Sequence, residues 1–196
     1  MPDTLPPRPL AVPLAKAYRL LNHGPTVLLS AEHGGRRNTM AAAWNMPLDF
    51  DPPKVAVVID KAVFTRGLVE ASGRFVLSLP CAAQRSLVDA VGGASGRSLD
   101  KEAAFGLRYL AGEAAPAESG GQPLVAGSVA WLACRRLPQP TIEQAHDLFL
   151  AEVEAAWADP RVFSNGRWHF DGHDALRTLH HVAGGAYFTP GTMLQG

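Results

Sequence analysis

The chain has 196 residues and a mass of 20.9 kDa, which is enough for one domain whose core needs neither a disulfide nor a metal for stability. Its 18 basic side chains balance 18 acidic ones, so no overall positive field favours nucleic acid or an anionic membrane as a partner. Hydrophobic residues make up 47% of the chain, which excludes a disordered protein, and the apolar runs are too short to span a bilayer. The start of the chain shows no secretory signal, so we expect a cytoplasmic protein.

The chain begins with a Pro-rich segment, residues 1–15, which predicts an extended arm that packs on another subunit. Short apolar runs separated by Gly- and Pro-rich turns follow it and predict strands. These strands are expected over residues 26–31, 39–44, 54–59, 74–80, 128–136 and 147–157. Many short strands with such turns are typical of a mainly antiparallel sheet or barrel.

Helices are predicted in a few places between these strands. The expected helices cover residues 65–71, 82–91, 98–105 and, from a weaker pattern, 174–181. Gly73 would end the first of them, and Ser98 would cap the third. Residues 112–123 are expected to form a surface loop. The pattern therefore favours a mainly β barrel with peripheral helices.

The two cysteines and the late histidines give little evidence for metal or thiol chemistry. Cys81 and Cys134 are far apart and follow apolar runs, so we expect packed thiols. His169 and His173 are four residues apart, but Gly172 lies between them and argues against a helical pair of ligands. No metal site is expected.

The segment from Asn38 to Trp44 is the first candidate site. Small residues on a strand let a flat ligand approach the backbone, while Asn38 and Thr39 offer polar groups and Trp44 an apolar plane. A tightly packed Ala-rich strand is the alternative interpretation.

The second candidate follows the strand predicted at residues 54–59. A helix that begins near Thr65 offers free N–H groups, and Lys61 and Arg66 add positive charge, a combination that suits a phosphate monoester. An ordinary Thr cap beside two solvated cations explains the same residues.

The third candidate is the loop at residues 92–101, which carries Arg97 and Lys101 into a helix. It matches neither a P-loop nor a dinucleotide-binding fingerprint, and a plain surface loop is an equal alternative. His146 precedes a predicted strand and is either a proton donor or a buried, hydrogen-bonded imidazole. Since no nucleophile elbow or carboxylate pair stands out, cofactor chemistry is favoured over nucleophilic catalysis.

The order of these segments resembles that of the flavin reductase-like family, the FMN-binding split β-barrels that include flavoredoxin. The resemblance runs from about residue 24 to residue 187. The segments that carry it are residues 24–30, 38–44, 51–55, 61–66, 73–80, 95–101, His146 and residues 184–187. It implies a Greek-key-like split β-barrel with peripheral helices, which forms a single FMN-binding domain over residues 16–196 after the arm.

The resemblance also assigns residues to the cofactor. The FMN site would comprise Asn38, Thr39, Met40, Ala41, Ala42, Ala43, Trp44, Lys61, Phe64, Thr65, Arg66, Ser95, Gly96, Arg97, Lys101 and Tyr187. Lys61, Thr65 and Arg66 would hold the phosphate, and His146 would be a candidate catalytic residue near the ring. Ala41 departs from the family pattern, because many relatives carry Thr or Ser there.

The function that the resemblance implies is an FMN-dependent oxidoreductase. NAD(P)H would deliver hydride to flavin N5, and electrons would pass to a second flavin, a partner oxygenase or a small acceptor. Family members are usually homodimers with FMN near the interface. Two alternatives stay open: an FMN-binding electron carrier without NAD(P)H turnover, and a flavin-free binding module on the same fold.

Overall fold

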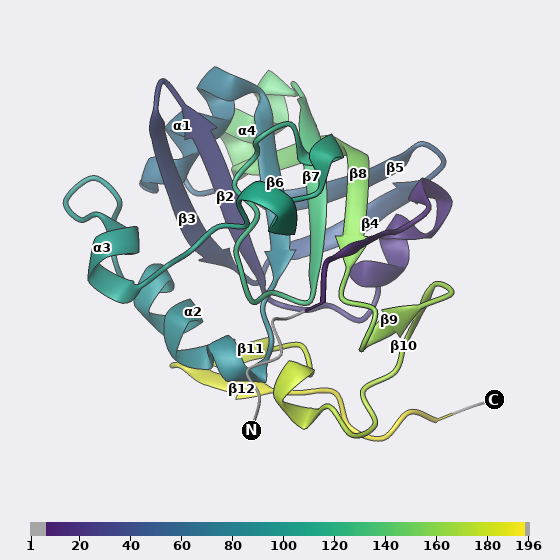
Figure 1. The fold of residues 1–196 in the computed structure, drawn as a ribbon. Coiled ribbons are helices and arrows are strands. Elements are labelled where there is room, and N and C mark those ends of the chain that lie inside the picture. The colour runs from purple at the N-terminus through teal and green to yellow at the C-terminus, as the bar shows by residue number, and fades with distance from the viewer. Residues whose placement is uncertain (1–6, 195–196) are drawn as a thin grey trace.

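The computed structural model describes residues 7–194, and an eight-stranded antiparallel sheet forms its centre (Figure 1). Its strands are β1 (Leu10–Ala11), β2 (Val27–His33), β3 (Arg36–Ala42), β4 (Asn45–Phe50), β5 (Pro53–Val58), β6 (Arg74–Leu79), β7 (Ala130–Leu137) and β8 (Leu148–Ala158). The strand order is β3-β2-β6-β7-β8-β5-β4, and β1 pairs with β8. The two outer strands, β3 and β4, are separated in the chain only by Ala43 and Trp44. The sheet must therefore curl until its edges approach each other, as in a split barrel.

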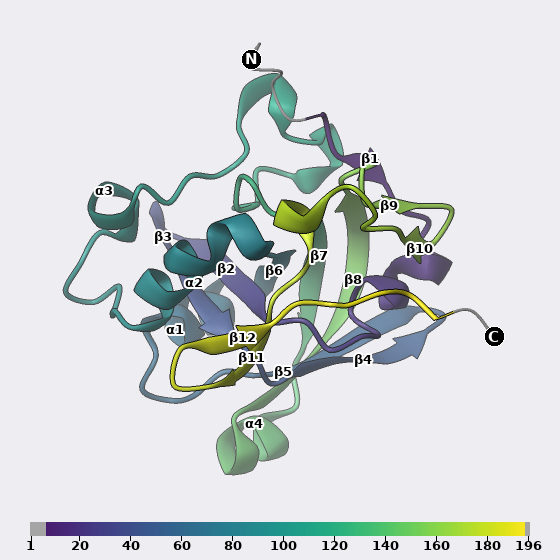
Figure 2. The same cartoon turned by 90° about the horizontal axis from the view of Figure 1, so that it is seen from below.

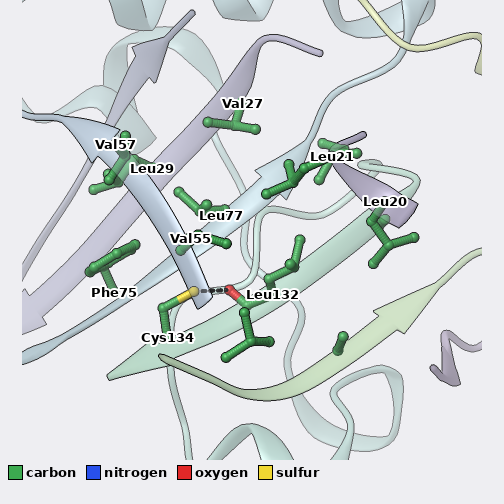
Figure 3. Close-up of a cluster of buried hydrophobic side chains, with 14 of the residues drawn as sticks. Leu20, Leu21, Val27, Leu29, Val55, Val57, Phe75, Leu77, Leu132 and Cys134 are labelled. Carbon is green, nitrogen blue, oxygen red and sulfur yellow. Dashed lines mark hydrogen bonds between the residues drawn. The ribbon is translucent and has the colours of Figure 1, made fainter. Parts of the chain in front are cut away.

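A hydrophobic core fills the curled sheet, as Figure 3 shows for side chains from several strands. Leu29, Val57 and Leu77 are fully buried there, because alternate side chains of each strand point to the same face. Cys134 lies in this core, where its thiol donates to the carbonyl oxygen of Leu132 at 3.5 Å and burial raises its pKa. Cys81 is also a buried free thiol, so the prediction of two packed thiols is confirmed.

The helices are short and lie around the sheet. The α-helices are α1 (Phe64–Ser72), α2 (Arg85–Gly92), α3 (Lys101–Phe105) and α4 (Pro140–His146). The 3-10 helices are η1 (Leu14–Leu20), η2 (Ala82–Gln84), η3 (Gly112–Ala114), η4 (Ala117–Ser119) and η5 (Asp174–Leu176). Helix α1 ends at Gly73, which takes the left-handed conformation (φ 67°) as expected. The mainly β fold with peripheral helices is thus confirmed.

Two short hairpins complete the described chain. They are β9 (Phe163–Ser164) with β10 (Arg167–Trp168), and β11 (His180–Ala183) with β12 (Ala186–Phe188). Of the helix expected over residues 174–181, only η5 at Asp174–Leu176 is helical, and the last two residues, His180 and His181, belong to the second hairpin. Figure 2 shows it beside α2, and the hydroxyl of Tyr187 donates to Asp89 of α2 at 2.9 Å. This contact between distant segments stabilises a strand conformation that the local sequence does not indicate.

Three other elements differ from the expectation. Helix α3 is capped by Asp100, whose carboxylate accepts from the backbone amides of Glu102 and Ala103, and not by Ser98. Helix α4 lies where a turn before a strand was expected. In the described part of the arm, Leu10 and Ala11 form β1 and pair with β8 of the same chain, and the packing of the arm on a second subunit stays a prediction. Residues 1–6 of the arm lie outside the described residues.

No helix within residues 7–194 is long and apolar enough to cross a membrane.

Candidate functional site

Two adjoining cavities run along β3, and we call them together the β3 cleft. The narrow end has a volume of about 300 Å³ and the wide end about 520 Å³. They share Met40, Ala41 and Gly92 as lining residues. Small residues on both walls, among them Ala41 of β3 and Gly92 of α2, leave the room for this cleft, as the small-residue pattern indicated.

The narrow end is closed by buried polar groups. The side-chain amide of Asn38 donates to the hydroxyl of Thr65 at 2.7 Å, and both residues are buried. Gly96 packs directly on this pair: a Cβ atom at Gly96 would lie 2.2 Å from Oδ1 of Asn38. Only glycine therefore lets the loop at residues 95–96 approach β3 this closely.

Helix α1 begins beside the same end of the cleft. Thr65 is its second residue, and the preceding Val63 supplies no side-chain cap. The first amides of a helix have no partner within the helix and carry a partial positive charge. The narrow end thus combines backbone donors, a hydroxyl and an amide, which are the groups that bind an anion.

Lys101 connects the two walls of the cleft. Its ammonium group is buried and donates to the carbonyl oxygens of Thr39 at 2.8 Å and of Val91 at 2.6 Å. Burial lowers its pKa to about 8. Because Thr39 is on β3 and Val91 is on α2, these hydrogen bonds hold the strand and the helix at the separation that leaves the cleft open.

The wide end is aromatic and more exposed. Trp44 is 75% exposed at its rim, and the ring of His181 packs edge-on against Tyr187 at 5.3 Å between centroids. Burial and the hydrogen bond to Asp89 raise the pKa of Tyr187 to about 12, so this phenol stays protonated at neutral pH. A flat apolar ligand fits between such surfaces.

The structure brings together most of the residues that the sequence assigns to the cofactor site. Those that line the cleft are Asn38, Met40, Ala41, Ala42, Ala43, Trp44, Phe64, Thr65, Ser95, Gly96, Lys101 and Tyr187. Those that do not are Thr39, Lys61, Arg66, Arg97 and His146. The Thr39 side chain instead bonds to the hydroxyls of Ser30 and Tyr109, each at 2.8 Å.

Lys61 and Arg66 face α4 and the residue after it. The guanidinium of Arg66 donates to Asp147 at 2.5 Å, to Glu70 at 2.9 Å and to two backbone carbonyls. The ammonium of Lys61 donates to the carbonyl of Gln144 and lies 3.4 Å from Asp147. Both cations are thus engaged by carboxylates of the protein itself, and their contact with a phosphate stays a prediction.

His146 is the last residue of α4 and precedes β8, as predicted, but it is exposed, so the interpretation as a buried imidazole is wrong. Asp89 and His181 line the wide end but were missed from the sequence. They lie on α2 and β11, which only the fold brings together. No sequence motif marks either residue as part of a site. Within residues 7–194, no group of three or more His, Cys, Asp or Glu side chains is placed to hold a metal.

Comparisons with known proteins point to one family. The model of the flavin reductase like domain matches residues 18–177. The uncharacterized protein YddH of Escherichia coli K12 is 44% identical over 185 residues, which cover 93% of this chain and 95% of that protein.

Solved structures agree with the family match. The FMN-binding domain of a flavin reductases-like enzyme from Shewanella baltica is 45% identical, with a TM-score of 0.92, over 98% of this chain and 100% of that one. An FMN-binding protein from Thermus thermophilus, solved with bound 1-cyclohex-2-enone, is 27% identical, with a TM-score of 0.72, over 88% and 89% of the two chains. The resemblance seen in the sequence is therefore confirmed.

Proposed function

Because this chain belongs to the flavin reductase-like family, we propose that it binds FMN in the β3 cleft and acts as an oxidoreductase. The observation that carries the proposal is the form of the cleft. Its narrow end offers buried polar donors, its wide end offers small and aromatic surfaces, and the two ends are continuous through Met40, Ala41 and Gly92. This polarity matches a ligand with a phosphate at one end and a flat ring at the other.

At the narrow end, the hydroxyl of Thr65, the side chain of Ser95 and the first amides of α1 would hold the phosphate. Asn38 would orient Thr65 through their hydrogen bond. Lys61 and Arg66 would add long-range positive charge, and they would contact a phosphate directly only after releasing Asp147.

At the wide end, the backbone of Ala41–Ala43 would face the polar edge of the ring, and Trp44 would cover part of its apolar surface. Ala41 has no hydroxyl, so this position contributes backbone groups alone. Tyr187, kept protonated at neutral pH and held by its hydrogen bond to Asp89, would form a wall of the ring site. When bound, flavin would supply the redox chemistry, with NAD(P)H as the proposed hydride donor.

We also propose a homodimer that covers the rim of the cleft. Trp44, which immediately precedes the outer strand β4, and Met46, Leu48 and Phe50 within that strand are 75%, 52%, 46% and 63% exposed and occupy every second position. A contiguous exposed apolar stripe of this kind marks an interaction surface. Since Trp44 also lines the cleft, a second copy seated on the stripe would lie next to the ligand. Phe50→Asp should turn a dimer into a monomer in sedimentation, and a wild-type monomer would contradict the proposal.

Titration of the cofactor-free protein with FMN, followed by quenching of flavin fluorescence, tests the site. Thr65→Val keeps the size of the side chain and removes its hydroxyl, so FMN should bind at least about tenfold more weakly, since hydrogen bonds to charged groups contribute about 1.5–3 kcal/mol. Thr141→Val, at an exposed position of α4 outside the cleft, is the matched control and should leave the affinity unchanged. Failure of the wild-type protein to bind FMN would overturn the proposal.

A further inference from the structure

A cavity of about 820 Å³ lies outside the β3 cleft and has no part in the proposed function. Three segments enclose it: His23, the β9–β10 hairpin with the residues that follow it, and the chain after β12. Figure 2 shows that last segment running past β10 toward the C-terminus. Within residues 7–194, the cavity shares no lining residue with the β3 cleft. We call it the C-terminal cavity.

Strand β11 separates this cavity from the wide end of the β3 cleft. The ring of His180 packs edge-on against His23, with 5.2 Å between the centroids, and His23 lines the C-terminal cavity. The next residue, His181, lines the wide end of the cleft. Successive side chains of a strand point to opposite faces, so the two spaces lie on opposite sides of β11. The C-terminal cavity is therefore a separate site, independent of the proposed FMN site.

One wall of the C-terminal cavity is aromatic. The rings of Trp168 and Phe170 are stacked, with 5.2 Å between their centroids and 15° between their planes. The ring of His23 packs edge-on against Trp168 at 5.4 Å. The indole N–H of Trp168 donates to the carbonyl oxygen of Arg19 at 3.2 Å, which holds the ring in place. A flat aromatic ligand packs well against such a wall.

Arg177 ties the opposite wall to the aromatic one. Its guanidinium donates to the carbonyl oxygens of Pro190 at 2.8 Å and of Gly191 at 3.1 Å. The same group lies over the ring of Phe170, 5.9 Å from its centroid, and donates to the carboxylate of Asp174 at 2.8 Å. These contacts hold the segment after β12 in place, and they leave the charge of Arg177 already paired within the protein.

His23 brings to this cavity a polar atom that the protein leaves unsatisfied. Its Nε2 atom lies 2.9 Å from the hydroxyl oxygen of Thr178, which is also 3.2 Å from Nε2 of His180. Its Nδ1 atom is buried and has no hydrogen-bond partner within residues 7–194. A buried polar atom without a partner is destabilising, so a ligand group that bonds to Nδ1 would remove this cost.

A hydroxyl group suits this nitrogen. Burial, aided by the charge of His180, lowers the pKa of His23 to about 4, so the ring is neutral at pH 7 and its Nδ1 atom is a donor or an acceptor according to the tautomer. A hydroxyl can both donate and accept, and it therefore bonds to either tautomer. At the rim of the cavity, Arg167 and Asp171 are exposed and carry opposite charges. The charges around the cavity thus favour a neutral ligand.

We propose that the C-terminal cavity binds a neutral, planar aromatic molecule that carries a hydroxyl group. The aromatic ring packs against the wall formed by Trp168 and Phe170, and the hydroxyl bonds to Nδ1 of His23. The cavity volume lies within the range of about 300–1,000 Å³ that is typical of small-molecule sites. A fused two-ring compound fits this space, whereas a single ion would leave the aromatic wall uncovered.

The test uses two probes, 2-naphthol and 2-methylnaphthalene, which carry a hydroxyl and a methyl group at the same position of the same ring system. Their binding to the full chain is measured by equilibrium dialysis, with and without saturating FMN. His23→Phe keeps an aromatic ring and removes its nitrogens. Met193→Trp enlarges an exposed lining residue, and Leu194→Trp is its matched control, because Leu194 is the exposed neighbour that does not line the cavity.

We expect His23→Phe to bind 2-naphthol at least about tenfold more weakly than the wild type, with its affinity for 2-methylnaphthalene within about twofold. Met193→Trp should weaken the binding of both probes at least about tenfold, and Leu194→Trp should change neither.

Three results would overturn the inference. The first is that the wild type binds no 2-naphthol at about 1 mM. The second is that His23→Phe keeps the wild-type affinity for 2-naphthol or loses affinity for both probes equally, because the hydroxyl would then not contact His23. The third is that FMN displaces 2-naphthol, because the probe would then occupy the β3 cleft.

Discussion

Replacement of Gly96 with Ala is the sharpest perturbation of the narrow end of the β3 cleft. The new Cβ would lie 2.2 Å from Oδ1 and 2.6 Å from Cγ of Asn38, and 2.9 Å from Cδ1 of Phe64. All three separations are too short for real contacts, so either the loop at residue 96 or the Asn38 side chain must move. Asn38 is buried and bonded to Thr65, so a displaced side chain would lose that hydrogen bond.

The cost has two parts. Overpacking a filled site destabilises a protein by about 1–3 kcal/mol. Displacing Asn38 also breaks its hydrogen bond to Thr65, which contributes about 1 kcal/mol. Partial relaxation of the loop offsets some of this, so we expect Gly96→Ala to lower the free energy of unfolding in urea by about 2 kcal/mol. Because the displaced groups line the proposed phosphate site, FMN should bind at least about tenfold more weakly, a loss of about 1.4 kcal/mol.

Gly67→Ala is the matched control on α1. No atom lies within 4 Å of a Cβ built there, and alanine is the better helix former by about 1 kcal/mol. This variant should be as stable as the wild type or more stable and should bind FMN equally well. The reasoning would be refuted if Gly96→Ala bound FMN with wild-type affinity and unfolded at the wild-type urea concentration.

Lys101→Met removes the ammonium group that donates to two buried carbonyls, so the free energy of unfolding in urea should fall by about 1–3 kcal/mol. An unchanged value would contradict the conclusion that Lys101 holds β3 and α2 together. Burial, aided by the charge of His180, lowers the pKa of His23 from 6.5 to about 4, so the unfolded chain binds more protons between these values. Stability should fall by up to about 3 kcal/mol as the pH drops from 6.5 to 4, and His23→Asn should flatten this dependence in urea titrations at several pH values. Arg66→Ala breaks a buried network and should lower the thermal midpoint by several degrees, whereas Lys61→Ala removes an exposed cation and should not. FMN titration of both variants tests the predicted contact of these two side chains with the phosphate. That prediction is wrong if neither variant changes the affinity for FMN.

The strands were predictable because their signal is local. Apolar runs bounded by Gly and Pro place β2, β3, β5, β6 and β7 within a few residues of their observed bounds. Helix α1 and its end at Gly73 follow from equally local rules. Strand β4 was missed because its apolar side chains alternate with polar ones and include Pro47, a pattern of an edge strand that faces away from the core.

The chemistry of the site was only partly predictable. The small residues of β3 indicated a cleft, because the size of the side chains on a strand can be read directly from its sequence. The partners of Arg66 were not predictable, since Asp147 is 81 residues away and the fold alone brings it there. The same holds for Tyr187 and Asp89, which are separated by 98 residues. Charged groups at a helix start predict a phosphate site from the sequence. The carboxylates that pair with these groups, and so weaken that prediction, become visible only in the structure.

The central claim, that this chain is an FMN-dependent oxidoreductase, is tested most directly by the visible absorbance spectrum of the FMN-loaded protein. The spectrum is recorded without oxygen before and after addition of NADH, and again with NADPH. We expect protein-bound flavin bands that bleach with at least one of the two donors. Flavin bands that persist with both would contradict NAD(P)H turnover and identify an electron carrier, and a protein that takes up no flavin at all would contradict the claim entirely.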